Sequence, residues 1–261
     1  MNAEEIKKQK EKNKMMNFKQ LTVGVAALVL SVTSFAAELH LYAGAGLRIP
    51  VDKVVADFEK ETGHKVIVEY GGSGQLLTRF NLTQEGDLFM PGSLDYIEKL
   101  KEKATGVYPL VLHTPAFVVR NDTGKDVHTF ADFAKSDLKL GLGDPKAIAL
   151  GKSGATLIKN SGFEKELQDK VVVHTSTIKQ LLLYVLNGDV DGAIIGRSDA
   201  VKHSDVLHII AAPEGTPEEI AAVATLSTSA DPALAKQLAE KFASKEGIKA
   251  FTDAGFLPVE P

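Results

Sequence analysis

Short apolar runs alternate with helix-like patterns from residue 39 onward, and this alternation limits the possible folds more than any other feature of the chain. Residues 39–42, 66–68 and 87–90 are brief β-type runs. Between them, residues 51–58 and 76–80 carry apolar side chains at the three- and four-residue spacing of a helix with one buried face. A repeated strand–helix order predicts an α/β fold built on doubly wound, mostly parallel sheets with flanking helices.

A second alternating unit follows a long extended stretch over residues 107–119. Its β-type runs lie near residues 138–142, 171–174 and 193–195, with helical patterns between them. No Pro/Ser-rich linker separates the two units. We therefore expect two lobes with the chain crossing between them, rather than two domains in tandem.

The expected division follows from where the extended stretches lie. Lobe 1 is predicted to comprise residues 37–117 together with the C-terminal residues 226–261, and lobe 2 residues 118–225. The C-terminal part has helical spacing through residues 234–251, so the chain is predicted to end on helices that pack on lobe 1.

The first 36 residues have the pattern of a secretory signal peptide. Lys19 precedes the apolar run LTVGVAALVLSVTSFA, and the small residues Ser34 and Ala36 predict cleavage after Ala36. Met15-Met16 directly precedes a leader of ordinary length, so translation could begin at Met16. An uncleaved N-terminal anchor is the alternative, although a membrane span needs about 20 apolar residues and this run is short. We expect an exported, periplasmic protein.

Composition excludes several classes of function. The chain has no Cys, which removes disulfides, thiol catalysis and Cys-ligated metals. Six Lys and three Glu give the leader a charge of +3. Because the whole chain has a net charge of −4, residues 37–261 have a net charge of −7. An acidic chain without a Lys/Arg cluster argues against nucleic acid as a partner. The seven His are scattered without metal-ligand spacing, and no cofactor is expected.

Two Gly-rich turns join predicted strands to predicted helices, at residues 42–47 and 70–75. In open α/β sheets ligands bind beyond the carboxyl ends of strands, and helix N-termini offer unpaired N–H groups that suit anions. Glycine allows a ligand to approach the backbone, and Ser73 adds a hydroxyl donor. Neither turn matches a Walker A motif or a full GxGxxG fingerprint. The turns therefore favour a small anion, or are tight turns without a ligand.

The stretch LHLYAGAGLRIPVDKVVADFEKETGHKVIVEYGGSGQLLTRF resembles the start of the periplasmic molybdate-binding protein family. The likeness continues at residues 87–89, at Gly143-Asp144-Pro145 with Gly151, at residues 198–200 and at residues 254–256, and so spans nearly the whole chain after the leader. The resemblance implies a type II periplasmic binding protein, with a cleft between hinged lobes. It also implies that the ligand is molybdate or tungstate, delivered to the membrane permease of an ABC importer by a monomer.

The family's ligand donors fall on five positions of this chain. The Ser of the first turn falls on Gly46 and the Tyr on Gly196, so two hydroxyls are missing. The Ser of the second turn is kept as Ser73, and the two backbone N–H donors fall near Leu150 and Ile178. Because a desolvated oxyanion needs nearly all its oxygens hydrogen-bonded, other donors must replace the lost hydroxyls.

Arg48 and Arg197 are the nearest candidates for that replacement, since each lies within two residues of a substituted position. A guanidinium can hold an anion through two N–H groups. The alternative is that both are surface residues. If either enters the cleft, sulfate, phosphate or a small organic anion becomes a plausible ligand.

A non-enzymatic binding protein is the expected function. No paired carboxylates or nucleophilic arrangement point to catalysis. A periplasmic enzyme on the same scaffold, such as a dehydratase, and a surface adhesin that has lost transport remain as alternatives of another class.

Overall fold

The computed structural model describes residues 36–259, together with the isolated residues 4 and 10. Residues 37–261 form one compact unit, separate from residues 1–36. The possible start at Met16 and the predicted signal peptide lie outside the described residues, apart from residues 4, 10 and 36. In the part of the chain that the structure describes, no helix combines the length and the apolar character that crossing a membrane requires.

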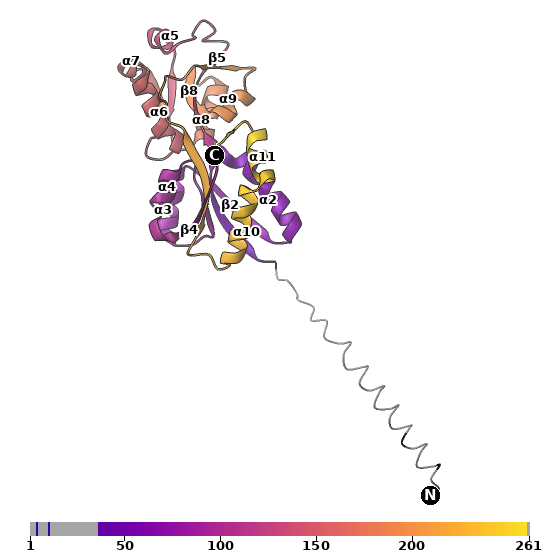
Figure 1. The fold of residues 1–261 in the computed structure, drawn as a ribbon. Helices are drawn as coiled ribbons and strands as arrows, with labels where there is room; N and C mark the ends of the chain where they lie inside the picture. The colour runs from indigo at the N-terminus through magenta and orange to yellow at the C-terminus, as the bar shows by residue number, and fades with distance from the viewer. Residues whose placement is uncertain (1–3, 5–9, 11–35, 260–261) are drawn as a thin grey trace. The chain divides into compact units, whose positions relative to one another are not determined.

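The chain from residue 37 builds two separate sheets, each with helices on both faces (Figure 1). The first sheet has six strands in the order β11-β4-β10-β3-β1-β2. Its strands are β1 (Glu38–Gly44), β2 (Lys65–Gly71), β3 (Leu88–Met90), β4 (Ala104–His113), β10 (Glu219–Leu226) and β11 (Leu257–Pro258). Strands β2 and β3 pair parallel to β1, whereas β10, β4 and β11 pair antiparallel.

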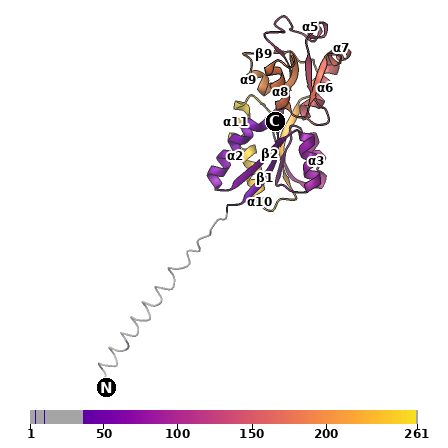
Figure 2. The same cartoon turned by 180° about the vertical axis from the view of Figure 1, so that it is seen from behind.

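Helices cover both faces of this sheet, and Figure 2 shows β1 and β2 between α2 and α3. One face packs against α2 (Arg48–Thr62), α10 (Pro232–Ala243) and α11 (Lys245–Asp253). The other packs against α3 (Ser73–Thr83) and α4 (Leu94–Glu98), and short 3₁₀ turns η1 (Ala45–Leu47) and η2 (Lys101–Lys103) complete the set. Helix α2 ends at Gly63, whose φ of 74° is accessible to glycine and whose N–H donates to the Glu59 carbonyl. We call this sheet and its helices lobe 1.

The second sheet has five strands in the order β7-β6-β8-β5-β9. They are β5 (Pro115–Arg120), β6 (Leu140–Gly143), β7 (Val171–Thr175), β8 (Gly192–Gly196) and β9 (Leu207–Ile210). The helices are α5 (Phe130–Lys135), α6 (Ala149–Asn160), α7 (Glu164–Gln168), α8 (Ile178–Asn187) and α9 (Arg197–Lys202). One apolar core lies under α8 and α9 and a second under α5, α6 and α7. We call this sheet and its helices lobe 2.

The two-lobed α/β architecture predicted from the sequence is confirmed, with sheets that are mixed rather than mostly parallel. Antiparallel pairing involves the four strands next to the crossings, β4, β5, β9 and β10, and also the C-terminal strand β11. Strand β10, for example, returns to lobe 1 and pairs antiparallel with β4, Ala221 opposite Val111. Period-two patterns identify a strand but not the direction of its neighbour, so the sequence could not give this part of the topology.

The sheets also divide the chain at different residues from those expected. Residues 115–117 belong to the second sheet and residues 219–225 to the first. The chain crosses at Thr114, between β4 and β5, and returns through residues 211–218. The extended stretch 107–119 is continuous in the sequence, so nothing in it marks the residue where the hydrogen-bonding partner changes.

Candidate functional site

Three helix N-termini meet where the lobes face each other. Helix α3 of lobe 1 begins after Gly72, and helices α6 and α8 of lobe 2 begin after Ile148 and Thr177. The first N–H groups of a helix have no acceptor within it and carry partial positive charge. The lobes are in direct contact here, since the N–H of Gly74 donates to the carbonyl of Ala147 at 2.9 Å.

Ser73, the first residue of α3, is buried at this junction. Only 3% of its surface is exposed. Its Oγ accepts a hydrogen bond from the N–H of Gly92 at 3.1 Å. Because Gly92 uses the oxygen as an acceptor, the hydroxyl hydrogen of Ser73 stays available to donate.

His113 lies at the centre of the junction, as the last residue of β4. It is 4% exposed, and its Nδ1 lies 3.1 Å from the carbonyl oxygen of Gly92. A carbonyl oxygen can only accept, so Nδ1 carries the ring proton and donates it. The Nε2 atom makes no hydrogen bond to any residue that the structure describes. One residue, Gly92, thus holds Ser73 through its N–H and His113 through its carbonyl.

The glycines that replace the family's Ser and Tyr both border the His113 ring. A Cβ at Gly46 would lie 3.3 Å from Nε2 and 3.0 Å from Cγ2 of Ile178. A Cβ at Gly196 would lie 3.5 Å from Nε2 and equally far from Cδ1 of Leu150. Two of the predicted site positions, Gly46 and Gly196, therefore border one imidazole, and Ile178 and Leu150 lie beside them. A Ser at Gly46 would crowd that ring.

Burial determines the protonation of His113. Loss of solvent lowers the pKa of the imidazole to about 4, against the opposing effect of the Gly92 carbonyl. The nearest charges act in opposite directions: Asp199 raises the pKa and Lys179 lowers it. The Lys179 Nζ and the Asp199 carboxylate form an ion pair with each other, at 2.6 and 2.9 Å. The ring is therefore neutral at pH 7.

The two arginines predicted as replacement donors have other partners in the structure. The guanidinium of Arg48 stacks over the ring of Tyr70, 3.9 Å from its centroid. The guanidinium of Arg197 donates to the carbonyl of Gly255 at 3.3 Å, and the backbone N–H of Arg197 donates to Thr114. The structure therefore brings Gly46, Ser73, Leu150, Ile178 and Gly196 together at the junction, and it engages both arginine side chains with other partners.

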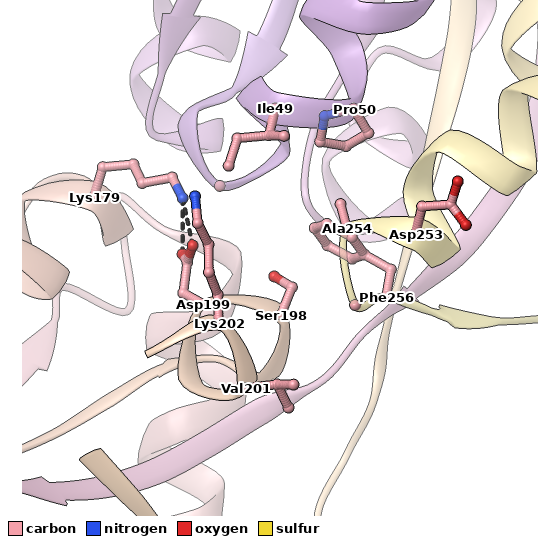
Figure 3. A pocket seen from close by; sticks show the side chains of 12 residues that line it. Ile49, Pro50, Lys179, Ser198, Asp199, Val201, Lys202, Asp253, Ala254 and Phe256 are labelled. Atoms are coloured by element: carbon pink, nitrogen blue, oxygen red, sulfur yellow. Dashed lines mark hydrogen bonds and ion pairs between the residues drawn. The ribbon is translucent and has the colours of Figure 1, made fainter. Parts of the chain in front are cut away.

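A pocket of about 350 Å³ opens beside this site, between α2 and the C-terminal segment of lobe 1 and helices α8 and α9 of lobe 2 (Figure 3). Gly46 and Phe256, two neighbours of His113, line its inner part. Lys179, Asp199 and Lys202 line the lobe 2 side, and Figure 3 shows the lysine side chains extending toward Ile49 of lobe 1. Solvent thus reaches close to the junction on a side that carries two lysines.

Sequence reasoning missed His113 and Gly92. His113 is one of seven scattered His, and neither residue lies in a recognisable motif. One signal was available for His113: it directly precedes Thr114-Pro115 within the extended stretch predicted to cross between the lobes. A polar residue at a predicted crossing is a candidate to face the cleft.

Two α/β lobes joined by two crossing segments, with buried polar side chains and helix N-termini at their junction, define the class of two-lobed, type II periplasmic binding proteins. Residues 39–257 match the family described as bacterial extracellular solute-binding protein, and the chain belongs to this family. Family membership makes it a solute-binding protein and not an enzyme.

The chain is similar to proteins of this class in sequence and in structure. A binding protein of Haemophilus influenzae is 47% identical over 241 residues, covering 91% of this chain and 98% of its own length. The periplasmic molybdate-binding protein of Azotobacter vinelandii superposes with a TM-score of 0.75 at 15% identity, over 85% of this chain and all of its own. The sulfate-binding protein SubI of Mycobacterium tuberculosis superposes with a TM-score of 0.75 at 18% identity, over 86% of this chain and 88% of its own. At such identities the structural likeness shows the fold alone.

Proposed function

We propose that this protein captures a small oxyanion between its lobes, molybdate or tungstate first among the candidates. Ser73, the backbone N–H groups near Leu150 and Ile178, and the space beside Gly46 and Gly196 form the binding position. The observation that carries the proposal is the convergence of Ser73 with the N-termini of α3, α6 and α8 around one buried point.

The chemistry of this donor set suits an anion with several oxygens. The hydroxyl of Ser73 and the N-terminal amides are all hydrogen-bond donors, and helix N-termini favour negative charge. The adjoining pocket is lined by two lysines and two aspartates, so its formal charge is balanced and the helix N-termini provide the attraction for an anion. The names of relatives agree with this chemistry, since molybdate-binding and sulfate-binding proteins share the fold.

Sulfate, phosphate or a small organic anion is the second candidate. The absence of side-chain hydroxyls at Gly46 and Gly196 favours it, because two side-chain donors of the molybdate-binding pattern are missing. His113 stands beside both positions, so the ligand must satisfy this imidazole as well.

The transport role follows from the same proposal. The predicted leader exports the chain to the periplasm, where a monomer binds the anion and presents its closed lobes to the permease of an ABC importer. Closure requires the ligand to contact both lobes, since only an interaction specific to the closed form shifts the equilibrium toward it.

Thermal shift and calorimetry against molybdate, tungstate, sulfate, phosphate and citrate test the proposal. At least one oxyanion is expected to raise the melting temperature in a concentration-dependent way. Ser73→Ala should weaken its binding by about 1–3 kcal/mol. Ser153→Ala is the matched control, because this buried serine on α6 has a hydroxyl without a hydrogen-bond partner in the described structure. Lack of stabilisation by all five anions would exclude the proposed function.

A further inference from the structure

The imidazole of His113 presents an unpaired acceptor to the proposed binding position. Its Nδ1 proton is committed to the Gly92 carbonyl at 3.1 Å, which leaves the lone pair of Nε2 directed toward Gly46 and Gly196. The ring is buried and held against Gly92, Gly46 and Phe256, so it cannot turn away without repacking the junction.

We propose that the site binds an oxyanion together with one proton, shared between Nε2 of His113 and the nearest anion oxygen, and that His113 thereby determines which oxyanions are selected. The inference rests on the proposed oxyanion-binding function. Two classes of ligand meet the requirement differently. A hydrogen-bearing oxyanion, such as hydrogen phosphate, brings its own proton and donates it to Nε2. A fully ionised one, such as sulfate or molybdate, has only lone pairs, so Nε2 must first take a proton from solvent.

The physical reason is that two acceptors cannot share a buried contact. An anion oxygen against an unprotonated Nε2 would leave both lone pairs unsatisfied away from water, which is unfavourable for each group. Sites built around a hydrogen bond therefore discriminate strongly against ligands that cannot complete it. Sulfate and hydrogen phosphate have the same charge and nearly the same shape, and differ by this one proton.

The groups around the ring set how readily it gains a proton. Of the elements that pack against it, α8 contributes Lys179 and α9 contributes Asp199, and these two charges pair with each other. Arg197 of α9 is bonded to the Gly255 carbonyl. The start of α2, the loop at Gly92, the start of α6 and the C-terminal segment present glycine or apolar side chains. Glu219 of β10 lies opposite His113 in register, and burial raises the pKa of its carboxyl, but it is not among the charges that shift the pKa of the ring. Because Asp199, the carboxylate that raises the pKa of the ring, is paired with Lys179, a bound anion is the group that would stabilise the protonated form.

Calorimetry with the purified protein tests this coupling directly. Sulfate, molybdate and phosphate are titrated at several pH values between 6 and 8, each in two buffers with different enthalpies of ionisation. The expected result for sulfate and molybdate is uptake approaching one proton per anion, with a Kd that rises up to about tenfold per pH unit. At pH 8, hydrogen phosphate is expected to bind at least tenfold more tightly than sulfate and to take up less proton.

Variants at His113 separate the alternatives. In His113→Gln the side-chain amide donates without taking up a proton, so sulfate binding should become independent of pH and the preference for phosphate should fall below threefold. A Kd for sulfate or molybdate that is flat from pH 6 to 8 in the unchanged protein, without proton uptake, would overturn the inference and leave the proposed function intact. Tighter binding of sulfate by His113→Ala would also overturn the inference, because it would show that the ring only occupies volume that the anion needs. Failure of every oxyanion to bind would overturn both proposals.

Discussion

Gly72 of lobe 1 lies against the backbone of lobe 2, where no side chain fits. Gly72→Ala should therefore weaken ligand binding by preventing full closure of the lobes. An alanine Cβ at this residue would lie 2.4 Å from the carbonyl oxygen of Ser176 and 2.7 Å from that of Ala147, both in lobe 2. The backbone itself tolerates alanine, since φ is −68° and ψ is 140°. The contact between lobes is therefore what requires glycine here.

The size of the effect follows from the overlap. An ordinary carbon–oxygen contact is about 1 Å longer than 2.4 Å, and both atoms that would be struck are backbone, so the lobes must separate at this edge. Overpacking of this kind costs about 1–3 kcal/mol. If ligand is held only by the closed form, Kd rises about 5- to 150-fold, taking about 1.4 kcal/mol for each factor of ten.

Gly71→Ala provides the matched control. The Cβ at Gly71 would meet the Leu76 side chain at 3.1 and 3.2 Å and the Gln75 side chain at 3.9 Å, both within the same lobe. Both variants are compared by calorimetry with the best-binding oxyanion and by thermal unfolding without ligand, which reports any loss at the start of α3 separately. If Gly72→Ala binds within twofold of Gly71→Ala, closure at this edge does not contribute to affinity, and the reasoning is refuted.

Three further variants test other parts of the structure. Arg48→Ala should leave the ligand Kd within about twofold, because its guanidinium stacks on Tyr70; the expected loss is about 0.5–1 kcal/mol of folding stability. A tenfold higher Kd in titrations would instead show that Arg48 contacts the ligand. Thr177→Ala removes the hydroxyl that caps α8 and should cost about 1 kcal/mol, or roughly 2–4 °C in melting temperature; an unchanged melting curve would show that the cap does not contribute. The stability of the ligand-free protein should fall as pH drops from about 6.5 toward about 4, since the unfolded chain binds the His113 proton first. The stability lost over this pH range amounts to about 3 kcal/mol. In denaturant titrations His113→Gln should lack this part of the dependence of unfolding free energy on pH; an identical dependence in both proteins would contradict the buried, neutral ring.

The sequence predicted the fold because its signals are local and repeated. The helical spacing in residues 51–58 predicted α2, and the same rule predicted most other elements. The short helices α7 and α9 were not expected from the sequence. The change of sheet partner at Thr114 leaves no local signal, which is why the lobe boundaries differ from those expected.

The candidate site was predictable only where a family pattern marked it. Position by position, the resemblance led to Gly46, Ser73, Leu150, Ile178 and Gly196, and the structure brings these five together. The compensation for the two lost hydroxyls was sought in residues adjacent in sequence, Arg48 and Arg197. The side chain that borders both positions is instead His113, on a strand distant in the chain, because the neighbours of a residue are determined by tertiary packing and not by sequence separation.

The position of His113 at the end of β4 has a mechanical consequence. His113 pairs in register with Glu219 of β10, and the chain leaves lobe 1 at the very next residue, so the two crossing segments begin beside the ring. Any rotation of one lobe against the other turns about these segments. Atoms near such an axis move little, whereas atoms at the distant rim of each lobe move much further, because displacement grows with distance from the axis. A small displacement at the imidazole would therefore accompany a much larger opening at the outer edges of the cleft.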